Sequence, residues 1–206
     1  MVRKIIKREN GIVVGNILDK RNEKNPVLSL LLKNYYKNLD DMVRKISPSS
    51  IHEVGCGEGH VISRYIGQER LLSGSDFSKS IIDIAQTNYG GKGIFFKDID
   101  VYNLSKNESA ELILCCEVLE HLQEPAFALK KIHDISTPYA IFAVPREPIW
   151  RVMNVVRGAY LKNWGNTPGH LQHWNLDQFL SLLQPNFKII DIKKPFPWVM
   201  VLTKRK

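Results

Sequence analysis

Apolar residues recur with helical spacing in one long segment near the start of the chain. Asn25 followed by Pro26 is typical of a helix start, because asparagine caps free backbone N–H groups and proline fits the first turn. Apolar positions then lie three or four residues apart as far as Ile46. A Ser-Pro-Ser segment at residues 47–49 breaks the pattern. We therefore expect one amphipathic helix over residues 26–46.

Beyond residue 50 the chain alternates short apolar runs with helical patterns. Such alternation is typical of repeated strand-helix-strand units in a parallel sheet. Helices are expected to begin near Gly59, near Ser78 and after Pro125. Strands are expected at residues 51–54, 71–75, 93–97, 112–116 and 139–144.

The last third of the chain changes this rhythm. Residues 146–175 form a long stretch that holds three of the four tryptophans. A helix over residues 176–183, capped by Asn175, and two strands over residues 187–192 and 198–203 are expected to follow. These two strands are close enough in sequence to pair, so the sheet should be mostly parallel with one antiparallel strand near its edge.

The predicted elements belong to one α/β domain that spans residues 1–206. A chain of 206 residues has the length of one ordinary domain with an insertion. It is expected to contain an N-terminal extension and helix (residues 1–46) and a central α/β core (residues 49–145). An insertion (residues 146–175) and a C-terminal helix with a strand pair (residues 176–206) are expected to follow.

Composition places the chain among globular proteins. Hydrophobic residues make up 44% of it and charged residues 24%, and no segment approaches the roughly 20 apolar residues that a membrane helix needs. The basic start lacks the apolar run of a secretory signal, so we expect a cytoplasmic protein. The cysteines Cys56, Cys115 and Cys116 suggest buried thiols rather than a disulfide or a zinc site.

The net charge of +8 is unevenly distributed. Residues 1–24, 146–175 and 188–206 together carry +12, which leaves −4 for the rest of the chain. This basic collar could steer an anionic substrate, a nucleic acid or an acidic membrane surface, or could only keep the protein soluble.

Three alternating glycines follow the first expected strand of the core. Gly55, Gly57 and Gly59 permit positive φ and a close approach of ligand to backbone, in a turn where a nucleotide can bind. A dinucleotide motif would need glycine at position 60, where this chain has His60. Glu53 precedes the turn, and its carboxylate favours a ligand that carries ammonium and sulfonium groups over a pyrophosphate.

Two further carboxylates follow the next two strands. Asp76 comes seventeen residues after Gly59, where an acid can accept hydrogen bonds from both ribose hydroxyls. Asp98 ends the third strand, where it could accept a hydrogen bond from an adenine amino group, or could only cap the following segment.

These residues resemble the class I S-adenosylmethionine-dependent methyltransferases. The first motif of that family matches Glu53 with the three glycines, its ribose and adenine motifs match Asp76 and Asp98, and residues 117–121 resemble the ubiquinone-biosynthesis type. The resemblance covers about residues 16–203. It implies a three-layer Rossmann-like sandwich with a seven-stranded sheet of order 3-2-1-4-5-7-6. It also implies S-adenosylmethionine as cofactor, with contacts from Glu53, Gly55, Cys56, Gly57, Gly59, Asp76, Phe77, Asp98, Ile99, Cys116 and Glu117.

The acceptor of the methyl group is not encoded in a motif. The chain lacks the Asn-Pro-Pro-Tyr signature of base N-methylation, and we expect O-methylation of a small molecule. Removal of a hydroxyl proton needs a base, and the candidates are His121, His170 and His173.

The insertion at residues 146–175 follows the fifth expected strand of the core and is expected to be a lid on the acceptor side. It offers apolar walls and guanidinium groups, or its tryptophans could simply seal a minor core. The residues concerned are Trp150, Tyr160, Trp164, Trp174, Arg146, Arg151 and Arg157.

Three further hypotheses stay open. Glu117, Glu120 and His121, with His170 and His173, resemble the metal-binding Glu-x-x-Glu-His of small-RNA 3′-terminal 2′-O-methyltransferases, although we assign no metal ligand. An RNA acceptor would accompany such a metal.

The second hypothesis is a nicotinamide-dependent oxidoreductase. The third is a non-catalytic module that keeps the cofactor pocket but binds nucleic acid or a protein partner. The oligomeric state is not predicted.

Overall fold

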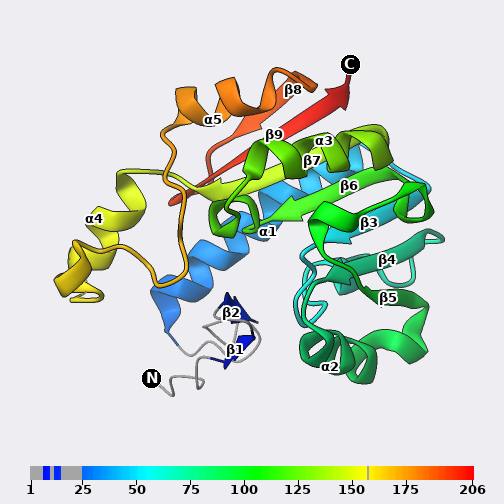
Figure 1. Ribbon diagram of the computed structural model, residues 1–206, viewed down its shortest axis with the longest axis horizontal. Helices are drawn as coiled ribbons and strands as arrows, with labels where there is room; N and C mark the ends of the chain where they lie inside the picture. The colour runs from blue at the N-terminus through cyan, green and yellow to red at the C-terminus, as the bar shows by residue number, and fades with distance from the viewer. Residues whose placement is uncertain (1–6, 10–11, 15–24, 157) are drawn as a thin grey trace.

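A seven-stranded sheet forms the centre of the computed structural model, which describes residues 7–9, 12–14, 25–156 and 158–206 (Figure 1). The strand order is β5-β4-β3-β6-β7-β9-β8, with only β9 antiparallel to its neighbours. Counted along the chain, this is the predicted order 3-2-1-4-5-7-6, so the fold prediction is confirmed. The strands are β3 (Ser50–Val54), β4 (Leu71–Asp76), β5 (Ile94–Asp98), β6 (Ala110–Cys116), β7 (Ser136–Pro145), β8 (Phe187–Lys193) and β9 (Trp198–Arg205). A separate antiparallel pair contains β1 (Lys7–Glu9) and β2 (Ile12–Val14).

Most helices begin at the residues that the sequence predicts. The Asn25 side chain accepts hydrogen bonds from the first turn of α1, Ser78 caps α2, and Asn175 forms a capping box with Gln178 in α5. The helices are α1 (Pro26–Ile46), α2 (Lys79–Tyr89), α3 (Pro125–Ile135), α4 (Ile149–Val156) and α5 (Leu176–Leu183).

One expected helix is much shorter than predicted. After Gly59 the chain forms only a four-residue 3-10 helix, η1 (Ile62–Tyr65). The segment must reach β4 at Leu71, and Gly67 already adopts a left-handed φ of 78°. A multi-turn helix does not fit into so short a connection.

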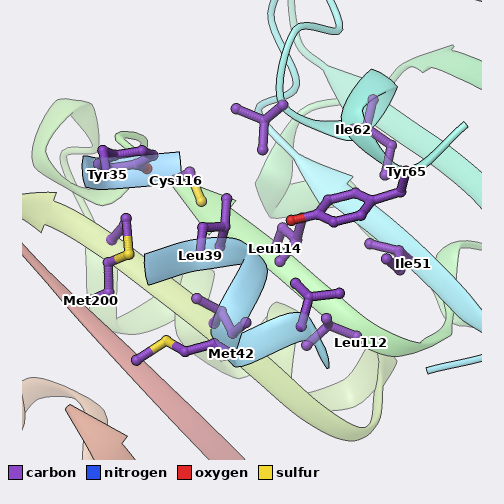
Figure 2. Close-up of a cluster of buried hydrophobic side chains, with 14 of the residues drawn as sticks. Tyr35, Leu39, Met42, Ile51, Ile62, Tyr65, Leu112, Leu114, Cys116 and Met200 are labelled. Carbon is purple, nitrogen blue, oxygen red and sulfur yellow. The ribbon is translucent and has the colours of Figure 1, made fainter. Parts of the chain in front are cut away.

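Helices on both faces of the sheet create two hydrophobic cores. On one face α1 packs Tyr35, Leu39 and Met42 against strand residues such as Leu114 and Met200 (Figure 2). On the other face α3 and α5 cover the same strands through a second cluster. Each fully buried side chain of this size stabilises the fold by roughly 1.5–3 kcal/mol before conformational entropy is counted. The three layers fix the carboxyl ends of β3, β4 and β6 side by side.

Two composition-based predictions can be compared with the structure. Cys56, Cys115 and Cys116 are free and buried, as expected. Among the described residues, no helix combines the length and apolar character needed to cross a membrane.

Candidate active site

A cavity of about 480 Å³ opens at the carboxyl ends of the parallel strands. Its lining comes from the segments after β3, β4, β5 and β6, from α1, and from the insertion at residues 146–175. Ligands of open α/β sheets bind in this position, because loops from neighbouring strands converge there. The cavity therefore joins the predicted cofactor motifs to the predicted acceptor side.

The glycine turn after β3 forms part of the cavity wall. Gly55 and Gly57 line the cavity and have φ angles of 68° and 53°, a region that side chains disfavour. A Cβ at Gly55 would also collide with Val118 Cγ2. Both positions therefore require glycine for backbone geometry.

Asp76 ties the ends of β3 and β4 together. Its Oδ2 accepts a hydrogen bond from the Gly57 N–H at 3.0 Å, and its Oδ1 accepts one from the Ser78 N–H at 3.0 Å. The carboxylate lines the cavity beside the glycine turn. One acid thus accepts hydrogen bonds from the turn and from Ser78, the N-cap of α2, while it lines the cavity.

Glu53 stabilises the segment that follows the glycine turn. Its side chain is buried and lines the cavity, and its Oε2 accepts the Ile62 N–H at 2.9 Å. The carboxylate fixes the chain that follows the glycines and adds negative charge to the cofactor end.

Four more predicted cofactor contacts reach the cavity. Cys56, Phe77, Ile99 and Cys116 all line it. Burial raises the pKa of the Cys56 thiol well above its ordinary value, so this group is a neutral contact.

Two predicted cofactor residues do not line the cavity. Gly59 has a φ of 81°, and a Cβ there would meet Phe96 Cζ at 2.9 Å, so this glycine serves packing. Asp98 ends β5 with an exposed side chain, and the cavity is lined instead by Asp100. The chain turns into the cavity only after the strand ends, and the adenine contact by Asp98 stays a prediction.

Glu117 has a strained backbone at the end of β6. Its φ of 58° is left-handed, a conformation that costs a non-glycine residue about 1–3 kcal/mol. The Glu117 N–H donates to the Ala143 carbonyl at 2.8 Å, and the Trp198 indole N–H donates to Glu117 Oε1. These bonds hold the carboxylate in the cavity lining.

The structure brings two of the three candidate histidines together. The rings of His121 and His170 lie 4.9 Å apart and both line the cavity. His173 is exposed, lies outside the lining, and places Nδ1 3.5 Å from Glu147 Oε1. It is therefore not brought into the site.

The environments of His121 and His170 differ. Burial, followed by the neighbouring His121, lowers the pKa of His170 to about 4, so its imidazole is neutral at physiological pH. His121 Nδ1 lies 2.9 Å from the Gly169 carbonyl and donates its proton there. This bond leaves His121 Nε2 as the proton acceptor.

Backbone hydrogen bonds attach the insertion to the loop after β6. The Glu120 carbonyl accepts the N–H groups of Leu171 and Gln172 at 2.8 and 3.0 Å. The Gln172 side-chain amide donates to the Leu122 carbonyl at 3.1 Å. These contacts set His170 beside His121 although the two residues are far apart in sequence.

The four aromatic residues expected to form the acceptor wall have different positions. Trp150 and Tyr160 line the cavity, and the Trp150 indole N–H donates to Thr167 Oγ1 at 2.9 Å. Trp164 is 80% exposed, and Trp174 packs on Phe179 in the second core. The insertion thus serves both as a cavity wall and as a minor core.

The two described arginines of the insertion do not line the cavity. Arg146 is absent from the lining, and Arg151 is absent too, since its Nε donates to the Trp164 carbonyl at 3.2 Å. Arg157 lies outside the described residues.

Three possible metal ligands converge at the base of the insertion. The ligating atoms of Glu120, His121 and His170 all lie within 4.8 Å of one another. Glu117 and His173, which the sequence also suggested, are not part of this set.

The sequence missed several lining residues. Leu28, Leu31 and Leu32 of α1 form part of the wall, and so do His60 and Tyr102. The α1 leucines have ordinary helical spacing, so nothing local distinguishes a cavity-facing leucine from a core leucine. His60 directly follows the third glycine of the turn, which was the available signal.

Comparison with known families supports the motif analysis. Residues 52–142 match a family model described as a methyltransferase domain. This segment contains the glycine turn and the ends of β3, β4 and β6. The comparison with curated proteins found no significant relative.

Solved structures share the fold at low sequence identity. Magnesium protoporphyrin IX methyltransferase from Synechocystis PCC 6803, with bound S-adenosylhomocysteine, has a TM-score of 0.69 and 16% identity, over 90% of this chain and 90% of that one. The N-methyltransferase NodS from Bradyrhizobium japonicum WM9 has a TM-score of 0.65 and 15% identity, over 91% of this chain and 93% of that one. The methyltransferase domain of bacterial CtHen1-CN has a TM-score of 0.66 and 17% identity, over 84% of this chain and 99% of that one. At these identities the likeness shows the fold alone.

Proposed function

We propose that the chain is a class I S-adenosylmethionine-dependent methyltransferase that transfers the methyl group to a hydroxyl of a small molecule, as its match to a methyltransferase-domain model over residues 52–142 and its strand order support. The single observation that carries the proposal is the continuous cavity. One end has the glycine turn with Glu53 and Asp76, and the other has Trp150 beside the His121 and His170 pair.

The carboxyl groups near the glycine turn fit S-adenosylmethionine. Carboxylates suit a ligand with ammonium and sulfonium groups, and Asp76 faces the predicted ribose position. When bound, the cofactor supplies an electrophilic methyl group on sulfur. The protein must then position the acceptor and exclude water, and the wall from α1 and α4 serves both needs.

His121 is the proposed base for the acceptor proton. Its Nδ1–H is occupied by the Gly169 carbonyl, so Nε2 presents a lone pair. His170 is a weaker base because its pKa lies near 4. We assign His170 the role of packing against the His121 ring and positioning it.

Replacing His121 by glutamine is expected to slow methyl transfer by about 10²–10⁴-fold, because general base catalysis contributes on that scale. Methyl-labelled cofactor and fractionated cell extract supply the assay and identify the acceptor. His173→Gln is the matched control, since His173 lies on the insertion but outside the cavity lining. S-adenosylhomocysteine affinity should be unchanged in both variants.

Two results would contradict this account. If no fraction of the extract accepts label from the wild-type protein, the methyltransferase proposal fails. If His121→Gln transfers label at the normal rate, the chain uses another base or simple proximity.

A divalent metal is a second candidate because Glu120, His121 and His170 converge. A carboxylate with two imidazoles suits manganese better than magnesium, which prefers oxygen ligands. An ion held there would supply Lewis acidity that makes a coordinated hydroxyl easier to deprotonate. His121 would then be a ligand rather than the base.

Chelation distinguishes the two mechanisms. If the metal is used, excess EDTA should stop methyl transfer and added Mn²⁺ should restore it. Mn²⁺ should fail to restore transfer by the His170→Ala variant but should restore it for His173→Ala. Full turnover in EDTA, with a near-normal rate for His170→Ala, would exclude the metal.

A further inference from the structure

We propose, on the basis of the function proposed above, that the acceptor is an apolar molecule without a carboxylate, sulfonate or phosphate, bound between α1 and the insertion at residues 146–175. The cavity supplies apolar contact area there, and none of the lysine and arginine side chains that the structure describes lines it. The basic collar inferred from sequence would instead favour an anionic acceptor, so the two expectations are opposed.

Apolar side chains from three elements form the acceptor end. Leu28 and Leu31 come from α1, Trp150 and Met153 from α4, and Trp198 from the start of β9. The Trp150 and Trp198 rings lie 5.7 Å apart. A wall of indole rings with leucine and a flexible methionine gains most from contact with another apolar surface.

Trp150 is held in a fixed orientation. Its indole N–H donates to Thr167 Oγ1, and its ring lies nearly parallel to His170 at a centroid distance of 6.1 Å. The buried Asn154 amide donates to the same Thr167 oxygen at 3.2 Å and to the Gly165 carbonyl at 2.8 Å. The indole therefore presents carbon rather than a polar group to the cavity.

Acidic side chains line the cavity. Among the side chains that the structure describes, which leave out Arg157 and Lys162 of the insertion, the lining contains no lysine or arginine. It contains five carboxylates, which are Glu53, Asp76, Asp100, Glu117 and Glu120. An anionic acceptor would approach like charges without the guanidinium or ammonium partner that carboxylate and phosphate sites ordinarily provide.

Neither described arginine of the insertion, Arg146 or Arg151, lines the cavity. The insertion's Arg151 donates to the Trp164 carbonyl and lies outside the lining. The described lining therefore offers an anionic acceptor carboxyl groups and no arginine or lysine partner.

Two dyes of similar shape test the proposal. N-phenyl-1-naphthylamine is uncharged, and 1-anilinonaphthalene-8-sulfonate adds one sulfonate to the same ring system. Fluorescence titrations use the full chain with saturating S-adenosylhomocysteine, so that only the acceptor end is free. The uncharged dye is expected to bind at least about tenfold more tightly than the sulfonate.

Variants of the insertion localise the binding. Trp150→Ala should weaken the uncharged dye about tenfold, whereas Trp150→Phe should largely keep its affinity. Trp164→Ala is the matched control, because Trp164 lies on the same insertion but is 80% exposed and outside the lining. Its dye affinity should equal that of the wild type.

The outcomes separate this inference from the proposed function. If S-adenosylhomocysteine binds by calorimetry but the sulfonate dye binds as well as the uncharged one, the acceptor class proposed here is wrong. Equal dye affinity in wild type and Trp150→Ala would also overturn it. If S-adenosylhomocysteine does not bind at all, the proposed function itself fails.

Discussion

Valine at position 57 is expected to weaken S-adenosylhomocysteine binding by at least about 100-fold, which corresponds to about 2.8 kcal/mol. Gly57 has a φ of 53° and donates its N–H to Asp76 at 3.0 Å. A β-branched residue resists this conformation and would add methyl groups to a turn that lines the cavity. Isothermal titration calorimetry measures the loss.

Gly67→Val is the matched control for this substitution. Gly67 also has a left-handed φ, of 78°, but a Cβ there meets nothing within 4 Å, and the residue lies outside the cavity lining. The control carries comparable backbone strain and should bind S-adenosylhomocysteine normally. Normal affinity in a folded Gly57→Val variant would show that the cofactor binds elsewhere.

Alanine at position 76 is expected to reduce cofactor affinity by about 1.5–3 kcal/mol, the range for hydrogen bonds to a charged group. The carboxylate holds the Gly57 and Ser78 N–H groups and faces the predicted ribose position. Its removal loosens the turn and deletes a predicted ligand contact. Calorimetry with S-adenosylhomocysteine quantifies the change.

Asp83→Ala removes the same charge from α2 without reaching the cavity. The Asp83 side chain is 64% exposed and pairs with Lys79 across one helical turn. Its affinity should stay within about 0.5 kcal/mol of wild type, as for most surface substitutions. If Asp76→Ala behaves like this control, another residue holds the ribose.

Local sequence signals predicted most of the fold. The caps at Asn25, Ser78 and Asn175 start helices where expected, because capping depends on residues within one turn. Apolar runs located all seven strands of the large sheet, with ends that differ from the structure by up to three residues. The strand order was implied by the resemblance to class I methyltransferases rather than by any periodicity.

Features set by distant contacts were not predictable in the same way. Asp98 and Asp100 are both acids near a strand end, and only the path of the chain shows that Asp100 lines the cavity. The pairing of His121 with His170 depends on hydrogen bonds between the Glu120 carbonyl and residues 171–172. Closure of the insertion over an acceptor, a cytoplasmic location and nucleic-acid binding stay predictions.

Calorimetric titration of the full wild-type chain with S-adenosylhomocysteine, beside NAD⁺, tests the central claim most directly. Both ligands carry adenosine, but only S-adenosylhomocysteine matches the Glu53 and Gly57 turn that lacks a glycine at position 60. We predict saturable one-to-one binding of S-adenosylhomocysteine and none of NAD⁺ under the same conditions. Binding of NAD⁺ without binding of S-adenosylhomocysteine would contradict the assignment.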